Sequence, residues 1–230
     1  MPSKKSNNKS ASRRSRRSSK TALVLYPLLI FTFIIWFLYR SLFEFPVWFD
    51  EIIGKSIFFG LPVWLYVTIT GGRKIIDSLD FGKMNSGLLL GLALGGLYGF
   101  TASLASLIGR GSTIVMVPLF ASTLFWWEFF LGLMTGFWET LFFFSFVMTG
   151  VLQRHKYWSL LNQVLLTAGI FLIFHIPNIV LRFSGTDILT EIILLFLFAV
   201  GQAFVFAKRR NFYTLVISHA IWGMVLLVHV

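Results

Sequence analysis

Long apolar stretches separated by short polar segments run through the whole chain. A window of about 20 residues, the length that a helix needs to cross the hydrocarbon core of a bilayer, identifies candidate spans. They cover residues 22–39, 52–70, 86–108, 119–150, 161–180, 188–207 and 212–230. The fourth is long enough to tilt or break, and residues 43–49 or 114–118 leave room for a short additional segment. The pattern predicts an all-α fold, a polytopic membrane helix bundle with about seven (seven or eight) transmembrane helices.

The composition supports a membrane protein. Apolar residues make up 57% of the 230 residues and charged residues 13%, about half of the charged share of a soluble domain. A water-soluble fold of this size cannot bury so much apolar surface, which excludes a soluble enzyme and a disordered protein. The chain contains no cysteine, so disulfides, a Cys-ligated zinc site and a thiol nucleophile are also excluded.

The net charge of +11 is unevenly distributed. Residues 1–20 carry eight Lys or Arg residues and no acid, so we expect a disordered basic cytoplasmic tail. Its expected partner is anionic lipid rather than nucleic acid, because an apolar span begins at once at Ala22. A cytoplasmic N-terminus places most Lys and Arg residues inside, as the positive-inside rule requires. The outer side then keeps Arg40, Lys55, Arg110 and Arg182. We expect a multi-pass protein of the cell membrane.

A stripe of small residues marks the third predicted helix. Gly91, Gly95 and Gly99 recur every four residues and therefore lie on one face. Such a stripe lets a neighbouring transmembrane helix approach closely. We interpret it as a packing feature without chemistry.

Very few ionisable side chains lie deep inside the predicted spans. The first outer loop takes Glu44, Asp50 and Glu51, and most other acids and histidines also fall in loops or near helix ends. The exceptions are Glu139, His175 and His219, on the fourth, fifth and seventh helices. At about 1.5 Å per residue they lie roughly 12–21 Å from the predicted cytoplasmic helix ends. Intramembrane ionisable residues are functional candidates, so we expect one shared site; a plain hydrogen bond that joins helices is the alternative.

The sequences around these residues carry a family resemblance. Residues 139–144 read Glu-Thr-Leu-Phe-Phe-Phe, residues 171–175 Phe-Leu-Ile-Phe-His and residues 219–223 His-Ala-Ile-Trp-Gly. In order and spacing they resemble Glu-Glu-x-x-x-Arg, Phe-x-x-x-His and His-x-x-x-Asn, the motifs of the CPBP family of intramembrane proteases. These are related to type II CAAX prenyl endopeptidases and to bacteriocin-processing and immunity proteins. We therefore divide the membrane part into an N-terminal three-helix region, 21–118, and a CPBP-like catalytic bundle, 119–230.

The chain departs from the family pattern at three positions. Thr140 replaces the second glutamate of the first motif, Phe144 replaces its arginine, and Gly223 replaces the asparagine of the third motif. The second motif is intact. Because Gly223 has no side-chain donor, Gln202 and Asn178 are candidate substitutes.

The resemblance implies an intramembrane endopeptidase that acts on a membrane-embedded or lipid-anchored protein or peptide. Glu139 would activate a water, His175 would help to hold that water, and His219 would donate to the developing oxyanion. We expect the site to open toward the cytoplasm. We expect no cofactor; the alternative is zinc, held by the same Glu139, His175 and His219.

Two functions outside this class stay open. A non-catalytic interaction or immunity-type membrane protein could use the same three residues to hold helices together, and the three departures favour that reading. A proton-coupled transporter could use Glu and His as a relay, but the sequence shows no internal repeat of the kind such transporters have.

Overall fold

A computed structural model describes residues 5–110 and 123–228 of the chain. Within those ranges the fold is helical and contains no strand. The α-helices are α1 (Lys5–Leu42), α2 (Val47–Phe49), α3 (Leu61–Thr70), α4 (Arg73–Ile76), α5 (Met84–Arg110), α6 (Thr123–Glu139), α7 (Thr149–Arg154), α8 (Leu160–Arg182), α9 (Thr186–Arg209) and α10 (Phe212–Val228). Three π-helical segments are η1 (Asp50–Gly54), η2 (Ser56–Gly60) and η6 (Thr140–Met148), and two short 3₁₀ turns are η3 (Asp77–Leu79) and η4 (Phe81–Lys83).

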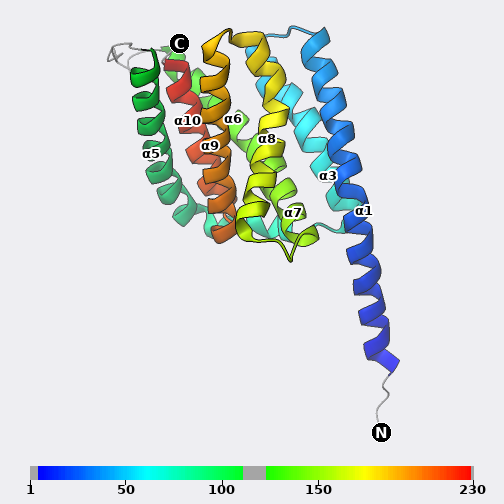
Figure 1. The fold of residues 1–230 in the computed structure, drawn as a ribbon. Helices are drawn as coiled ribbons and strands as arrows, with labels where there is room; N and C mark the ends of the chain where they lie inside the picture. Colours follow the sequence, from blue (N-terminus) through cyan, green and yellow to red (C-terminus); the bar gives the residue numbers. More distant parts are fainter. Residues whose placement is uncertain (1–4, 111–122, 229–230) are drawn as a thin grey trace.

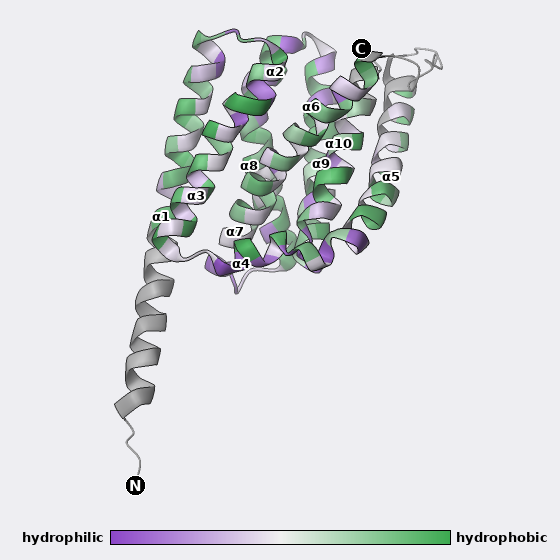
Figure 2. Ribbon diagram, turned by 180° about the vertical axis from the view of Figure 1, so that it is seen from behind, coloured by the Kyte–Doolittle hydropathy of each residue, from purple (hydrophilic) through white to green (hydrophobic). Residues whose placement is uncertain are grey.

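The helices stand side by side in one bundle (Figure 1). Segments that are long and apolar enough to cross a membrane are Val24–Leu42, Val47–Thr70, Leu124–Arg154, Leu160–Arg182 and Thr186–Arg209, and Phe212–Met224 is a shorter apolar helix. Together with α5 these match the predicted spans one by one. The bodies of the helices are hydrophobic, whereas hydrophilic residues gather around α4 at one end of the bundle (Figure 2). The predicted fold class, a polytopic all-α membrane bundle, is confirmed.

Some expectations about segment limits differ from the structure. Helix α1 extends back to Lys5, where we expected a disordered tail, because the basic segment contains no Gly or Pro between Lys5 and Ala22 that would break a helix. Residues 43–49 do not form a separate span, since α2 runs directly into η1. The proposed boundary between residues 118 and 119, and the possible segment at 114–118, lie outside the described residues.

The loops predicted to be cytoplasmic meet at one end of the bundle, the end from which α1 enters (Figure 1). Lys83 Nζ donates to the carbonyl of Arg210 at 3.2 Å, and Asn211 Nδ2 donates to the carbonyl of Lys83 at 2.9 Å, so the loop before α5 and the turn before α10 are joined. We call this the basic end. It carries Arg73, Lys74, Lys83, Arg154, Lys156, Lys208, Arg209 and Arg210. Which side of the membrane it faces stays a prediction.

The glycine stripe packs as predicted, and its partner is α10. A Cβ added at Gly91 would lie 2.8 Å from the carbonyl oxygen of Thr214, and one at Gly95 would lie 2.9 Å from Cβ of Ile221. Real Cβ atoms do not approach that closely, so only glycine allows α5 and α10 to pack at this distance. Because α10 carries His219, this contact helps to place one of the candidate site residues.

An aromatic core fills the bundle between the candidate site and the basic end. Phe142, Phe143, Phe144 and Phe146 of η6 are all fully buried. Phe142 and Phe143 pack in stacked, tilted and edge contacts with Phe59 of η2 and with Phe171 and Phe174 of α8, and Phe144 stacks on Phe171. This core gives three different helices a rigid common packing surface just beside Glu139.

Candidate functional site

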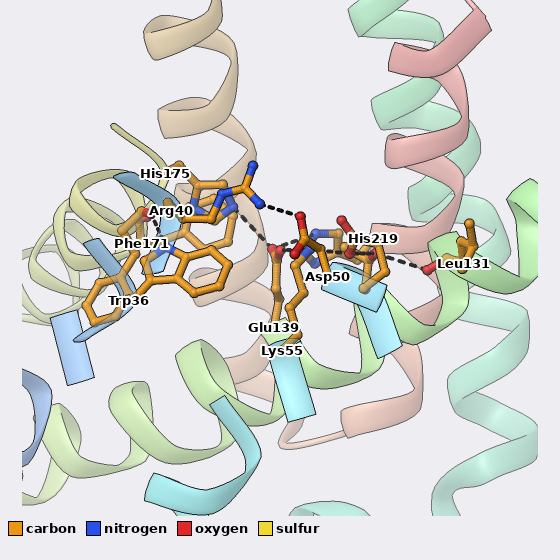
Figure 3. Close-up of polar contacts among 12 residues, drawn as sticks. Trp36, Arg40, Asp50, Lys55, Leu131, Glu139, Phe171, His175 and His219 are labelled. Carbon is orange, nitrogen blue, oxygen red and sulfur yellow. Dashed lines mark hydrogen bonds and ion pairs between the residues drawn. The ribbon is translucent and has the colours of Figure 1, made fainter. Parts of the chain in front are cut away.

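The structure brings the three predicted residues together. Glu139 Oε2 lies 3.3 Å from His175 Nε2 and 3.2 Å from His219 Nε2 (Figure 3). Their side chains are 5%, 14% and 7% exposed, so the cluster is enclosed by protein. Helices α6, α8 and α10 each supply one residue. One carboxylate oxygen therefore faces two imidazole nitrogens in a site that excludes most of the solvent.

The helix that carries Glu139 changes type at that residue. Helix α6 ends at Glu139, and the π-helical segment η6 begins at Thr140. Two further π segments, η1 and η2, lie on either side of Lys55 in the facing helix. π-Helical segments are rare and are frequent at functional sites, where the wider turn re-aims side chains. No feature of the hydropathy pattern predicted these segments, because they lie in predominantly apolar runs that show no clear helical period.

The intact Phe-x-x-x-His motif has a clear structural basis. Residues four apart lie on one face of a helix, and the carbonyl of Phe171 is 2.8 Å from Nδ1 of His175. A carbonyl only accepts, so Nδ1 carries the proton. Nε2 of a neutral His175 then has no hydrogen, and His175 donates to Glu139 only as an imidazolium. The ring of Phe171 also stacks on the imidazole, with centroids 4.1 Å apart.

His219 is held by aromatic contacts with Phe171 and Phe198. The ring of Phe198 on α9 meets its imidazole edge to face at 4.9 Å. Nδ1 of His219 is buried without a hydrogen-bond partner, so nothing in the described contacts prevents Nε2 from carrying the proton. In that form Nε2 is a donor. This is the state that a stabiliser of an oxyanion needs.

The proposed substitutes for the missing asparagine differ in availability. Gln202 Nε2 donates to Ser218 Oγ at 2.8 Å, so its amide group is engaged next to His219 rather than at it. Asn178 is partly buried, and its Oδ1 has no hydrogen-bond partner. Neither contacts Glu139, His175 or His219 through a hydrogen bond among the described residues.

The departures from the family pattern have different surroundings. Thr140 and Phe144 are fully buried, and Phe144 stacks beside Phe171 with centroids 6.0 Å apart. The arginine position of the first motif is thus part of the aromatic core. At Gly223 an added Cβ would meet nothing within 4 Å. The asparagine position of the third motif is therefore open space.

The site contains a charged residue that we did not predict. Lys55 Nζ lies 2.6 Å from Glu139 Oε1 and 2.5 Å from Glu51 Oε2. Lys55 is only 5% exposed. The placement of Glu51 in an outer loop was wrong, because Glu51 lies within the helical span Val47–Thr70. The assignment of Lys55 to the outer side stays a prediction. The available signal was the spacing of Glu51 and Lys55, which places an acid and a base one turn apart on one face of a helix rather than in a loop.

Further polar groups extend from Lys55 toward the end of the bundle opposite the basic end. Thr135 Oγ1 donates to Glu51. Arg40 donates to Asp50 (Figure 3). Tyr39 also donates to Asp50, at 2.5 Å. Asp50 is 8% exposed, so it too is not a loop residue as expected. The opening toward the basic end stays a prediction. Buried phenylalanines of η6 lie on that side of the site, and the described polar groups adjoin the site from the other side.

The zinc alternative does not fit these contacts. Glu139, His175 and His219 are suitable donors by type, but the Lys55 ammonium already binds Glu139 Oε1. A second cation beside the ammonium would be repelled in a medium of low dielectric constant. Within the described ranges, no group of three or more His, Cys, Asp or Glu side chains is arranged to hold a metal ion.

Comparisons with known proteins agree with the motifs. No curated protein and no solved structure matches the chain. Residues 121–225 match the family model described as type II CAAX prenyl endopeptidase Rce1-like, and this segment contains Glu139, His175 and His219. The chain is a multi-pass membrane protein, and its segment 121–225 is similar to the type II CAAX prenyl endopeptidase Rce1-like family.

Proposed function

We propose that the chain is an active intramembrane endopeptidase in which Glu139 activates the attacking water. The observation that carries this proposal is the position of Glu139 Oε2, which is buried and faces Nε2 of both histidines. Peptide hydrolysis needs a base, a positioned water and a donor for the oxyanion, and this arrangement supplies a group for each. The substrate class is a membrane-embedded or lipid-anchored protein or peptide.

The reaction follows from the placement of these groups. A water bound at Glu139 Oε2 attacks the carbonyl carbon of the scissile peptide bond, and Glu139 accepts one proton from it. A new carbon–oxygen bond forms, and the carbonyl oxygen becomes an oxyanion that accepts a hydrogen bond from Nε2–H of His219. The carbon–nitrogen bond then breaks as Glu139 returns the proton to the leaving amine. His175 Nε2 orients the water.

This reaction requires no metal. The Lys55 ammonium binds Oε1 of Glu139, so a metal ion at the same carboxylate would lie beside a positive charge. Without a metal ion, the other carboxylate oxygen, Oε2, can accept a proton from the water. Activity of the purified protein should therefore survive exhaustive chelation. Loss of activity on chelation and its return with zinc would overturn this part of the proposal.

The experiment compares three proteins in proteoliposomes with membrane-anchored peptide substrates: wild type, Glu139→Gln and Glu128→Gln. Glu128 lies on the same helix but is exposed, so it is the matched control. Loss of the general base should lower kcat by at least about 10²-fold in Glu139→Gln, with Glu128→Gln unchanged. Equal cleavage in all three proteins, or cleavage in none, would exclude the protease mechanism.

A non-catalytic interaction or immunity-type protein is the second candidate. The two oxygens of the Glu139 carboxylate already face an ammonium and two imidazoles. A polar cluster whose role is to hold helices together would have its groups paired in this way, which favours this candidate. In that case Glu139→Gln would reduce the melting temperature strongly, and the wild type would cleave none of the peptides.

A further inference from the structure

We infer that Lys55 is a positioning residue for Glu139, supplied by the half of the chain that lies outside the family match. The inference rests on the proposed function of Glu139. It adds to the site a residue that none of the three motifs contains. The segment 121–225 would then be an incomplete catalytic unit, because its base depends on a cation from the N-terminal half of the chain.

The first step is the charge of the site. Among the ion pairs of the described residues, Lys55 is the one Lys or Arg side chain that pairs with Glu139. The side chains of Lys55 and Glu139 are 6% and 5% exposed, so water cannot replace the pair. An isolated buried carboxylate would take up a proton, and a protonated Glu139 cannot act as a base. Lys55 keeps the carboxylate ionised.

The second step is the location of the cation. The arginine of the family's first motif lies on the same helix as its glutamate, but here that position is Phe144, which is fully buried in the aromatic core. The facing helix supplies the positive charge instead. Lys55 is the residue between the two π segments η1 and η2, which places an ammonium opposite Glu139.

The third step is that the two oxygens of the Glu139 carboxylate have different partners. Lys55 binds Oε1, whereas both imidazoles face Oε2. One oxygen is thereby anchored, and the other is directed toward the position of the water. Lys55 is itself fixed by Glu51 Oε2, which also accepts from Thr135 on α6. A chain of contacts therefore runs from α6 through Glu51 and Lys55 back to Glu139 on the same helix.

The test separates positioning from a merely structural role. We would measure kcat and KM against pH in proteoliposomes for the wild type, Lys55→Met, Lys55→Arg and Lys74→Met, an exposed lysine at the basic end. Lys55→Met should lower kcat about 10²-fold with little change in KM. The acidic limb of its kcat profile should move to higher pH, because the ionised base has lost its cation. Lys55→Arg should restore much of kcat, and Lys74→Met should match the wild type.

A second variant keeps the test decisive if Lys55→Met does not fold. Glu51→Gln leaves Lys55 paired with Glu139 alone and removes a nearby negative charge, so its acidic limb should move to lower pH, opposite in sign to Lys55→Met. Unmoved pH profiles in both variants, or a loss of kcat that Lys55→Arg does not recover, would overturn the inference. The proposed function is tested separately, by comparing the activity of the wild type with that of Glu139→Gln.

Discussion

Phe171 holds His175 in two ways, through its backbone carbonyl at 2.8 Å from Nδ1 and through its ring, stacked with centroids 4.1 Å apart. The carbonyl determines which nitrogen carries a proton, and the ring limits the rotation of the imidazole. Nε2 is consequently directed at Glu139. The spacing of the motif is therefore a requirement of helix geometry, since only a residue one turn earlier presents both groups to the imidazole.

This arrangement predicts different outcomes for two substitutions of His175. His175→Asn places an amide nitrogen near the position of Nδ1, so the bond to the Phe171 carbonyl persists while Nε2 is lost. His175→Ala removes both. We expect both variants to lose at least about 10²-fold in kcat, whereas only His175→Ala loses about 1 kcal/mol of stability from the missing hydrogen bond. Cleavage assays and thermal unfolding in detergent measure the two effects. Near wild-type activity in His175→Asn would contradict the role of Nε2.

The fold and the motif residues could be predicted, because each rests on a local signal. Apolar runs of about 20 residues identify spans, and a Glu or His within such a run stands out against its neighbours. Lys55 was missed for a physical reason. It lies near the beginning of its span, where a lysine can reach water by extending its side chain, and only the tertiary fold shows that it points inward to Glu139. The π segments were missed because their hydropathy resembles that of an α-helix.

The contact between α5 and α10 predicts a contrast between two neighbouring glycines. Gly91→Ala places a Cβ 2.8 Å from the backbone carbonyl of Thr214, which cannot move aside without shifting α10. We expect a loss of about 1–3 kcal/mol and reduced activity, because His219 shifts with the helix. Gly96→Ala is the control, since its Cβ meets nothing within 4 Å. Equal melting temperatures of the two variants would show that the stripe does not control this packing.

His155 at the basic end predicts a pH dependence of stability. Burial, together with the nearby positive charge of Arg154, lowers the pKa of His155 below its usual 6.5. Its Nε2 lies 2.5 Å from the hydroxyl of Tyr26, and only the neutral imidazole accepts that hydrogen bond. The unfolded chain therefore binds more protons than the folded one just below pH 6.5. The stabilisation that neutral His155 gives the folded state is complete above pH 6.5 and decreases as the pH falls toward the lowered pKa.

Melting temperatures of the wild type and His155→Gln at pH 7.5 and pH 5 check this sign. The wild type should lose more stability than His155→Gln on acidification, because the variant has no imidazole to protonate. The same loss in both proteins would assign the pH dependence to other groups.

The open space at Gly223 predicts a gain of activity. Gly223 lies one turn after His219 on α10, and a Cβ added there meets nothing within 4 Å, so an asparagine fits without displacing its neighbours. A side-chain donor at this position would reach the same side of the helix as His219 and share the oxyanion. A single oxyanion donor is typically worth about 10²–10³ in kcat, and an unrefined one should still raise kcat of Gly223→Asn by about 10-fold with KM unchanged.

Gly169→Asn is the matched control, because Gly169 on α8 is equally open. The gain must also vanish in Gly223→Asn combined with Glu139→Gln, since a donor for the oxyanion is useful only after the base has activated the water. A gain that persists without Glu139, or one that Gly169→Asn reproduces, would show that the added amide acts by a route other than the oxyanion.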